Sequence, residues 1–493
     1  MEKDELFFWS ILSFIFGILC GSLYTLSLNR PLLFGSAVFV AIFSVFPRKT
    51  VAGVYIIFLA WCGGSYLALT EKKTFQSLLS LTETVRGEVR IVSDPEERDF
   101  FRHILVRFET CMNTPCPEAL ILWQAPLSFE EPAGTRLSFS CVLERPKNFV
   151  PEFDYGMFLA KDGVGYICAK ADQITVLEPD AAGNLRALFY APKHTLENAL
   201  SQILSEPEAG LAKGLLLGGD HSLPKALKDD FTKVGLSHMI AVSGYNITLI
   251  AEMLLALGLF FGLWRRQAIW TALIGIVFFI VMIGMPASAA RAGAMASIVF
   301  IALQTGRLAR PMNALLFAGG VMLFFNPLLL RYDLGFQLSF LATLGILWVV
   351  PYYERFAPQG LILKKLGEVL VMTFAVELFV LPIILFTFHT ASPLIIVGNF
   401  LVILVPFAMA LAFVSAVLFL VLPGAHTVVA WGAFGILTLI TRSVEWLGDR
   451  GGNITVENFR IFHLILWYIL LGVFVAVLHR YFSLQPYESK QKI

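Results

Sequence analysis

The segment FFWSILSFIFGILCGSLYTLS, residues 7–27, contains no charged side chain. About 20 consecutive apolar residues are needed to cross the hydrocarbon core of a bilayer as a helix. Similar runs recur along the 493-residue chain, in which 57% of the residues are apolar and only 15% are charged. A soluble globular protein has roughly 45–50% apolar and about 25% charged residues. The sequence therefore predicts a polytopic α-helical membrane protein and excludes a soluble enzyme as the description of the whole chain.

The apolar runs form two membrane-spanning regions separated by a more polar segment. We expect about 12 spans of roughly 20 residues each. The predicted spans are residues 7–27, 32–47, 51–69, 236–263, 267–285, 288–304, 312–330, 334–352, 366–388, 394–420, 426–446 and 463–480. Lys and Arg are more frequent in alternate short loops, and loops rich in these residues stay on the cytoplasmic side. This bias predicts that both termini are cytoplasmic and that the polar segment after the third span is extracytoplasmic.

These patterns predict five consecutive regions. Three N-terminal transmembrane helices occupy residues 1–69, and an extracytoplasmic β domain occupies residues 70–185. Amphipathic linker helices are expected in residues 186–235, a second transmembrane domain in residues 236–480 and a cytoplasmic tail in residues 481–493. The formal net charge of +1 provides no overall field that would attract a polyanion.

The region 70–185 shows the short alternating pattern of half-buried strands. The alternating segments are TVRGEVRIV (84–92), FRHILVRFET (101–110), EALILWQ (118–124) and TRLSFSCVLE (135–144). Period-two alternation between Pro, Asn and Asp clusters is typical of strands with one buried face. About five such strands in about 100 residues suit a small barrel. We therefore expect an inserted small extracytoplasmic β-barrel, with an OB-like barrel as the leading candidate.

Four of the six cysteines fall in this β region: Cys111, Cys116, Cys141 and Cys168. An even number of cysteines in an oxidising compartment favours disulfides. Cys111 and Cys116 enclose the short loop CMNTPC, and we expect a disulfide between them. The pairing of Cys141 and Cys168 is left open. A metal site would need two further ligands nearby, and the sequence has no CxxC motif or paired His.

The sequence lacks the motifs of nucleotide-driven or metal-dependent catalysis. It has no GxxxxGK[ST] phosphate-binding loop and no HxHxDH, HExxH or EF-hand pattern. We therefore expect no cofactor, no catalytic metal and no enzymatic activity.

Polar side chains cluster at the start of the predicted span 236–263. His238, Ser243, Gly244 and Asn246 fall within nine positions. Clustered polar groups inside a span usually face a bundle interior or an aqueous path, because burying them in lipid is costly. A Ser-Gly pair also loosens helical packing, as in the broken helices of transporters. In the structural alternative, Ser243 bonds to its own helix and Gly244 only lets a neighbouring helix pack closely.

Arg291 lies among small residues in the predicted span 288–304. An arginine at the centre of a span costs about 2.5–3.5 kcal/mol, so it needs a carboxylate, water or a polyanion as partner. Glu252 and Glu377 lie in other predicted spans and are candidate structural partners. A buried ion pair and a phosphate-binding site are both compatible with this pattern. Further polar residues at or inside later spans are Asp333, Gln337, Ser339 and Asn399.

A series of segments follows in a specific order along the chain. They are PEFDYGMFLAKDGVGY (151–166), GLLLGGD (214–220), FTKVGLSHMIAVSGYN (231–246), SAARAGAM (288–295), Asn326-Pro327 and DLGFQLSFLA (333–342). This ordered set resembles the ComEC family of DNA-uptake channels. The resemblance covers most of the chain, up to about residue 410.

The resemblance implies a membrane channel that conducts single-stranded DNA across the cytoplasmic membrane during natural transformation. Residues 236–480 would then form a competence-type channel domain in the lipid bilayer. The resemblance also implies an extracytoplasmic DNA receptor, a nuclease and a cytoplasmic ATPase or helicase as partners, and it leaves the oligomeric state open. Matching positions become candidates for the DNA path or its supporting shell: His238, Ser243, Gly244, Asn246, Arg291, Gln337, Ser339 and Asn399.

Two features depart from the family pattern. Many members carry a C-terminal metallo-β-lactamase-like domain, and its HxHxDH motif does not occur here, so we expect the nuclease to be a separate protein. Residues 71–180 hold 12 Lys and Arg against 18 Asp and Glu. A nonspecific DNA platform gains its affinity by neutralising phosphates, so the β region would need a local basic strip. The arginines available for such a strip are Arg86, Arg90, Arg102 and Arg107.

Aromatic residues of the β region could stack on bases, but alternating strand positions more often belong to a core. These residues are Phe100, Phe101, Phe108, Trp123 and Phe139.

Two other functions remain as alternatives. A secondary transporter of a small anion would use a broken-helix site near Ser243 and Arg291. An intramembrane hydrolase would use Ser243 as nucleophile and His238 as base. Their five-residue spacing separates them by about 140° on one helix, which disfavours the hydrolase.

Overall fold

The structure is a computed structural model, and it forms two compact units. The first comprises Met1–Thr195 and Ala251–Gln337, and the second comprises Leu196–Ile250 and Leu338–Ile493. The structure describes residues 3–23, 60–68, 84–93, 95–97, 100–112, 116–129, 131–148, 154–178, 185–218, 223–240, 244–285, 287–304, 311–356, 358, 360–422 and 424–483. The predicted span 32–47, most of 51–69, Ser243 and residues 484–493 of the predicted tail lie outside these ranges.

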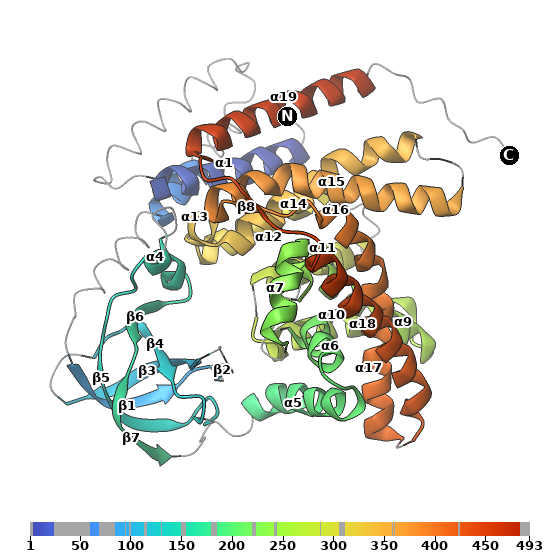
Figure 1. Cartoon of the computed structure of the whole chain (residues 1–493). Helices are drawn as coiled ribbons and strands as arrows, with labels where there is room; N and C mark the ends of the chain where they lie inside the picture. Colours follow the sequence, from blue (N-terminus) through green and yellow to red (C-terminus); the bar gives the residue numbers. More distant parts are fainter. Residues whose placement is uncertain are drawn as a thin grey trace. The chain divides into compact units, whose positions relative to one another are not determined.

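The first unit contains one mixed β-sheet, drawn in blue to teal in Figure 1. Its strand order is β6-β4-β3-β1-β5-β7, and β2 pairs with β3. Strands β4 and β6 run parallel, whereas the other neighbours are antiparallel. The strands are β1 Thr84–Ile91, β2 Glu96–Glu97, β3 Arg102–Cys111, β4 Leu120–Ala125, β5 Arg136–Val142, β6 Val164–Cys168 and β7 Ala171–Glu178. Each of the four alternating segments therefore contains a strand.

The core of the sheet follows from the alternation of its strands. Side chains alternate between the two faces of a strand, so every second apolar residue enters the same core. Phe108, Trp123 and Phe139 are all buried in this core. Their burial agrees with the interpretation that aromatic residues at alternating strand positions form a core. Phe100, in contrast, is 82% exposed.

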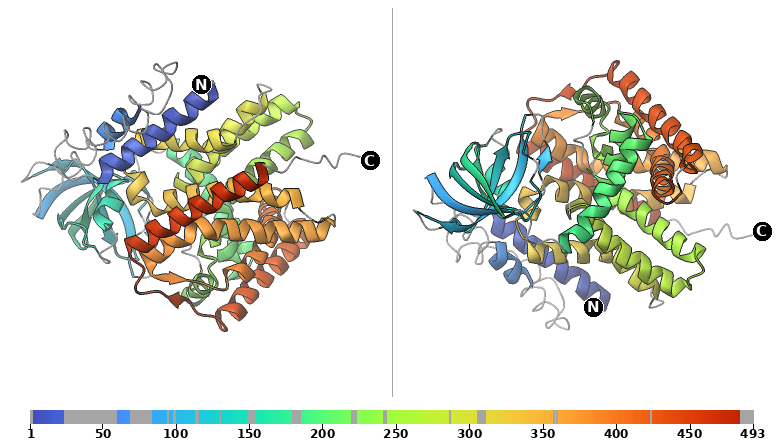
Figure 2. Two further views of the ribbon diagram at one scale, coloured as in Figure 1. Left: turned by 90° about the horizontal axis from the view of Figure 1, so that it is seen from above. Right: turned by 90° about the horizontal axis from the view of Figure 1, so that it is seen from below.

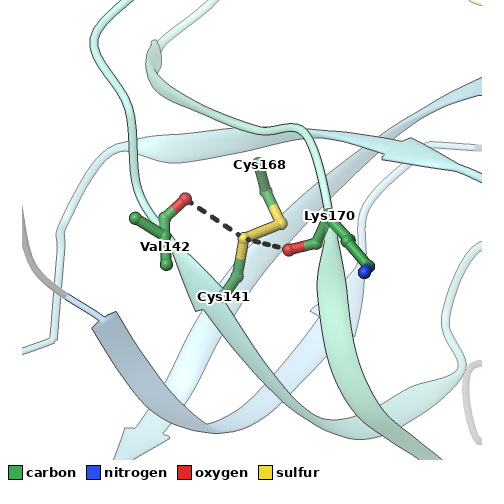
Figure 3. The surroundings of a disulfide bond; sticks show 4 residues. All are labelled: Cys141, Val142, Cys168 and Lys170. Carbon is green, nitrogen blue, oxygen red and sulfur yellow. Dashed lines mark hydrogen bonds between the residues drawn. A yellow bond between two sulfur atoms is a disulfide. The ribbon is translucent and has the colours of Figure 1, made fainter.

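Two disulfides cross-link the sheet domain. Cys111 is bonded to Cys116, as expected, and Cys141 is bonded to Cys168, which joins β5 to β6. The Cys141 sulfur lies 3.3 Å from the carbonyl oxygen of Lys170 and 3.4 Å from that of Val142. Figure 3 draws both contacts beside the disulfide. A disulfide sulfur carries no proton to donate, so these are sulfur–oxygen contacts.

The expected OB-like barrel is not established by the strand pairing. The strand path is open, with β6 at one end and β7 at the other. One isolated antiparallel bridge joins Glu144, just after β5, to Ile167 of β6, through backbone bonds of 2.9 and 2.8 Å.

The helices of the first unit pack through small residues. Gly17 of α1 lies so close to the 60–68 helix that an added Cβ would collide with the carbonyl of Trp61. The Ser65 hydroxyl donates a 2.9 Å hydrogen bond to the Gly17 carbonyl. Helix α1 also packs along α12 and α13, and Arg331 of α13 donates to the Ser22 carbonyl. The helices of this unit are α1 Lys3–Leu23, α4 Tyr155–Ala160, α10 Arg265–Met282, α11 Ala287–Gln304, α12 Pro311–Phe325 and α13 Leu329–Tyr332.

The second unit is mainly helical, and Figure 2 shows α19 lying along α15 within it. Three helices belong to both units by sequence: α5 Leu185–Ile203, α9 Gly244–Phe260 and α14 Leu334–Phe356. The other elements are α6 Glu208–Leu217, α7 Lys225–Val234, α8 Ser237–Ile240, α15 Leu361–Phe388, β8 Thr390–Ala391, α16 Ile395–Gly398, the 3₁₀ helix η2 Asn399–Leu404, α17 Val405–Val421, α18 His426–Gly448, β9 Ile454–Thr455 and α19 Ile461–Ser483.

Helix α6 differs from the amphipathic linker helix expected there, because nearly all its residues are buried. Its first residue, Glu208, is only 6% exposed. The Thr438 hydroxyl on α18 donates to the Glu208 carboxylate at 3.0 Å, and the Thr441 hydroxyl lies within reach of both this carboxylate, at 3.5 Å, and the Thr438 carbonyl, at 3.1 Å. These bonds satisfy the carboxylate inside the apolar packing of α6, α17 and α18.

Among the described residues, six helices are long and apolar enough to cross a membrane. They are Arg265–Met282, Leu334–Glu354, Lys364–Phe388, Ile395–Val421, His426–Gly448 and Ile461–Leu478, and three shorter apolar helices are Phe8–Ser22, Asn246–Phe260 and Pro311–Phe325. These helices support a multi-pass membrane protein. The expected count of 12 spans is not confirmed.

One predicted span changes its helix type along its length. The span predicted at 394–420 starts as α16, continues as the 3₁₀ helix η2 and becomes α-helical at Val405. Short 3₁₀ stretches within a longer helix often mark hinges or functional sites. The apolar composition of this segment gave no sign of the 3₁₀ stretch. In the span predicted at 236–263 the structure describes α8 and α9, and residues 241–243 lie outside the described ranges.

Candidate functional site

The first candidate site lies where the sheet domain meets the helices of its own unit. Met157 and Ala160 of α4 share a small apolar core with Leu328 and Tyr332 beside α13. Figure 1 shows α4 next to α13. We call this contact, between residues 155–163 and residues 326–333, the domain junction. It joins two segments that the family resemblance had singled out separately.

Polar groups fix the domain junction. The Asn326 side-chain amide donates a 2.7 Å hydrogen bond to the Lys161 carbonyl. The Lys161 ammonium lies 3.2 Å from the Asp333 carboxylate and 2.9 Å from that of Asp162. Burial by itself would lower the pKa of Lys161, but the two carboxylates outweigh it and raise the pKa above its usual value. Lys161 therefore stays charged, and Asp333 supplies its buried counter-charge.

Asp333 also serves two other groups. Its Oδ1 accepts a 2.8 Å hydrogen bond from the Phe336 backbone at the start of α14, where a negative charge is favoured by the helix dipole. Its charge acts on Arg291 of α11, a residue only 2% exposed. Asp333 therefore supplies a counter-charge for Arg291, and Glu252, one of the two expected partners, is exposed.

Gln337, also in the first unit, has a structural hydrogen-bonding role. Its side-chain amide donates to the carbonyls of Leu330 and Arg331, both at 2.9 Å. Both carbonyls belong to the short helix α13. The last carbonyls of a helix have no backbone N–H group of their own helix to accept from. Gln337 therefore holds α13 against the start of α14.

The second candidate site lies in the second unit, near the place where the end of α7 meets α16. Gly235 ends α7 in the left-handed conformation, with φ of +82°, and an added Cβ there would lie 3.0 Å from Ile395 of α16. The Ser392 hydroxyl donates to the Lys233 carbonyl. We call the set formed by α8, the start of α9, α16 and η2 the interrupted-helix site, after the 3₁₀ stretch that follows α16.

The polar residues of the interrupted-helix site have different surroundings. Asn246 is buried and donates a 3.2 Å hydrogen bond to the Leu215 carbonyl of α6. Asn399 donates a 3.2 Å hydrogen bond to the Thr373 hydroxyl of α15. His238 is exposed on α8, and Gly244 is half-buried as the first residue of α9. Ser339, further along in α14, is half-buried.

The eight candidates therefore fall into two groups. Arg291 and Gln337 belong to the first unit; the other described candidates belong to the second. Sequence reasoning noted Asp333 as a polar residue at a span but missed Lys161 and the pairing of the two. The available signal was that both lie in segments of the family resemblance and carry opposite charges.

The four arginines that could form a basic strip on the sheet have different partners, and Arg90 is ion-paired with an acidic residue. Arg90 lies 2.6 Å from Glu109, and Arg136 lies 2.8 Å from Glu109 and 3.5 Å from Glu88. Burial would raise the pKa of Glu109, but its bonds to Arg90 and Arg136 lower it below the usual value. Arg86 and Arg102 donate to the Ser140 hydroxyl and the Phe129 carbonyl, at 3.3 and 2.8 Å. Arg107 is exposed.

Comparison with known proteins agrees with the segments that form these sites. Residues 215–481 match the sequence model of the family described as "Competence protein". ComE operon protein 3 of Bacillus subtilis (strain 168) is 23% identical over 283 residues, which cover 57% of this chain and 35% of the relative. The match thus spans about a third of the relative's length. No solved structure matches the chain significantly. Since the family match covers more than half of the chain and agrees with the ordered motifs, the protein belongs to the Competence protein family, of the ComEC type.

Proposed function

We propose that the protein is a channel that conducts single-stranded DNA across the cytoplasmic membrane during natural transformation. The observation that carries this proposal is the family match over residues 215–481, which contains every candidate path residue. A DNA strand crossing lipid needs cationic, amide and hydroxyl groups around its phosphates and bases. The domain junction and the interrupted-helix site contain groups of these kinds within apolar helices.

In this proposal Arg291 meets the phosphates of the passing strand. Asp333 is its counter-charge at rest, and a phosphate takes the place of this carboxylate during passage. Charge-assisted hydrogen bonds from arginine to phosphate are strong and geometrically specific, so one buried arginine can orient the strand. His238, Ser243, Gly244, Asn246 and Asn399 would line the path or support its lining.

We propose that the sheet domain is an extracytoplasmic OB-like barrel. The parallel β4–β6 pair, the Glu144–Ile167 bridge and the Cys141–Cys168 disulfide support a return from β5 to β6 that closes five strands. The ion pairs between its acidic and basic residues favour a role in docking at the domain junction over strong DNA binding. The disulfides support an oxidising compartment.

The remaining arrangement is also proposed. The chain would have three helices in residues 1–69, linker helices in residues 186–235 and a channel domain in residues 236–480, with 12 spans and both termini cytoplasmic. An extracytoplasmic receptor would deliver DNA, and a separate nuclease and a cytoplasmic ATPase or helicase would act with the channel. The protein itself would not be an enzyme.

The test measures uptake of labelled DNA in cells whose own copy is deleted. Wild type is compared with Arg291→Lys, Arg291→Ala and Arg291→Glu, at checked membrane levels. Arg442→Ala is the matched control, because the Arg442 side chain is 77% exposed and pairs only at the surface with Glu445. We expect Lys to retain part of the uptake, Ala to lose most of it and Glu to lose more than Ala.

Each other outcome has a defined meaning. Normal uptake by all Arg291 variants would assign Arg291 to a structural ion pair with Asp333 and move the search for the path to His238 and Asn246. Normal uptake in the deletion strain would refute the DNA-channel function and favour a transporter of a small anion.

A further inference from the structure

Glu377 is a carboxyl group at the middle of a predicted membrane span. The apolar window of α15 runs from Lys364 to Phe388, and its midpoint is one residue from Glu377. The charged residues of this window are otherwise confined to its first turns. An ionised carboxylate at the centre of a span is among the most costly groups a membrane helix can carry. Such a residue is retained only where it has a partner or a function.

Glu377 has no hydrogen-bond or ion-pair partner among the described residues, although it is half-buried. The described elements with the most extensive packing against α15 are α16, η2, β8 and α19, and α14 approaches it at Gly345 and Trp348. Their only ionisable residue near the level of Glu377 is Tyr468, whose hydroxyl already donates a 2.8 Å hydrogen bond to the Phe379 carbonyl. The other ionisable residues lie near the ends of these helices: Tyr352, Tyr353, Glu354 and Arg355 of α14, and His463, His479, Arg480 and Tyr481 of α19. None of these described elements supplies a positive charge at this depth.

The polar groups nearest along α15 are already engaged. Thr373 lies one turn before Glu377; its hydroxyl donates to the Val369 carbonyl at 2.8 Å and accepts from Asn399. A hard metal cation would need about six oxygen ligands. The Glu377 carboxyl cannot supply them, because the neighbouring Thr373 hydroxyl and Asn399 amide already form hydrogen bonds with other groups. A proton needs only the carboxyl oxygen, so it is the ligand that fits.

The helix beyond Glu377 has a built-in weak point. Pro382 cannot donate a backbone hydrogen bond to the Leu378 carbonyl. The Trp467 indole of α19 donates to this carbonyl instead, at 3.0 Å. At this point a side chain of α19, and not a backbone hydrogen bond of α15, holds the segment next to Glu377. The helix can therefore bend there without losing a backbone hydrogen bond.

We propose that Glu377 is a proton-binding site at mid-membrane depth. At rest the group is the neutral acid, and when water enters the helical unit its O–H bond breaks, the proton passes to water and the carboxylate remains. The site gives the unit a response to the proton gradient. Coupling of this response to DNA uptake rests on the proposed function, whereas the proton site itself does not.

The first experiment detects the protonated acid directly. Membranes that contain the full-length protein are treated with dicyclohexylcarbodiimide, which modifies protonated carboxyl groups in apolar surroundings, and the α15 peptide is examined by mass spectrometry. We expect an adduct on Glu377 that falls at least about fivefold between about pH 6 and about pH 9. Glu377→Gln should abolish it, and Glu368→Gln, near the end of the same helix, should not. An adduct that is absent, or equal at both pH values, would overturn the proposal.

The second experiment tests coupling in cells. Glu377→Gln should reduce DNA uptake at least about tenfold at normal membrane levels, while Glu377→Asp and Glu368→Gln keep most of it. The residual uptake of Glu377→Gln should no longer respond to a protonophore. Wild-type uptake with unchanged protonophore sensitivity in Glu377→Gln would refute the coupling. If the deletion strain itself takes up DNA normally, the proposed function fails, and the labelling result still decides on the proton site.

Discussion

The domain junction and the interrupted-helix site both place polar groups among apolar helices, but they satisfy them in different ways. At the junction the groups are charged and matched, with Asp333 facing Lys161 and acting on Arg291. At the interrupted-helix site they are neutral: Asn246 bonds a backbone carbonyl, and Asn399 bonds a hydroxyl. Matched buried charges fix one geometry, because separating them is costly. Neutral amide bonds exchange for water or a ligand at lower cost. The difference favours the junction as the fixed part and the interrupted-helix site as the adaptable part.

Loss of the shared carboxylate should have the largest effect. Asp333→Ala leaves Lys161 and Arg291 without their buried counter-charge and removes the cap of α14. We expect the free energy of unfolding to fall by about 3–5 kcal/mol, measured by thermal unfolding in detergent. The control is Asp162→Ala, which removes the other Lys161 partner, a carboxylate 54% exposed. Equal losses of unfolding free energy in the two variants would show that the Asp333 pair is no more stabilising than an ordinary surface ion pair.

The buried amide of the interrupted-helix site should rank second. Asn246→Ala leaves the Leu215 carbonyl without this donor inside the protein. A loss of about 1–3 kcal/mol in unfolding free energy is expected by the same thermal assay. Thr248→Ala is the control, since the exposed Thr248 hydroxyl bonds only to the Gly244 carbonyl of its own helix. A loss as large as that of Asp333→Ala would show that this site is as rigid as the junction.

Asn399 should affect transport more than stability. Asn399→Ala removes the hydrogen bond to Thr373 at a half-buried position, where about 0.5–1.5 kcal/mol of stability is expected to be lost. Thr373→Val removes the same bond from the other side and keeps Asn399. If Asn399 meets the strand, uptake of labelled DNA falls in Asn399→Ala and stays near wild type in Thr373→Val. Equal uptake in both variants would assign Asn399 to packing alone.

The smallest effect is expected on the ion-paired face of the sheet. The folded protein lowers the pKa of Glu109 below its ordinary value of 4.5, so the stabilisation is present above that value. It is lost as the pH falls through the lowered folded pKa. Glu109→Gln should therefore reduce the acid dependence of sheet stability, followed by the fluorescence of the buried Trp123. The expected change is under about 1 kcal/mol, and Glu178→Gln at the exposed rim should change it less. A larger effect would show that the ion pairs on the sheet contribute to stability as strongly as the charged groups of the domain junction.

Local patterns in the sequence predicted the elements well. The alternation in 84–92 and 101–110 predicted β1 and β3, because burial of one strand face depends only on neighbouring residues. Apolar length likewise predicted helices over 366–388 and 426–446. The 3₁₀ stretch η2 was missed, since hydropathy measures transfer to lipid and carries no information on backbone geometry.

The sites depended on contacts that no local pattern contains. The cost of burying Arg291 predicted a counter-charge, but the part played by Asp333 emerged only from the structure, in which its charge acts on Arg291. Lys161 and Asp333 lie far apart in sequence, and only the docking of α4 brings them together. Glu377 was expected to be a partner for Arg291, and its isolation in α15 emerged only from the arrangement of α14, η2 and α19.

The Cys141–Cys168 disulfide also bears on the order in which the protein is assembled. Both sulfurs are buried, so the bond has to form before the sheet closes over them. The loop that it closes contains α4 and Lys161, the whole contribution of the sheet domain to the junction. With the sheet domain outside the cell membrane, as proposed, oxidation follows export of the chain and precedes docking of α4. Biogenesis would then proceed in three steps, from insertion of the first helices through oxidative folding of the sheet to its attachment to α13. A chain retained in the reducing cytoplasm would stop before the last of them.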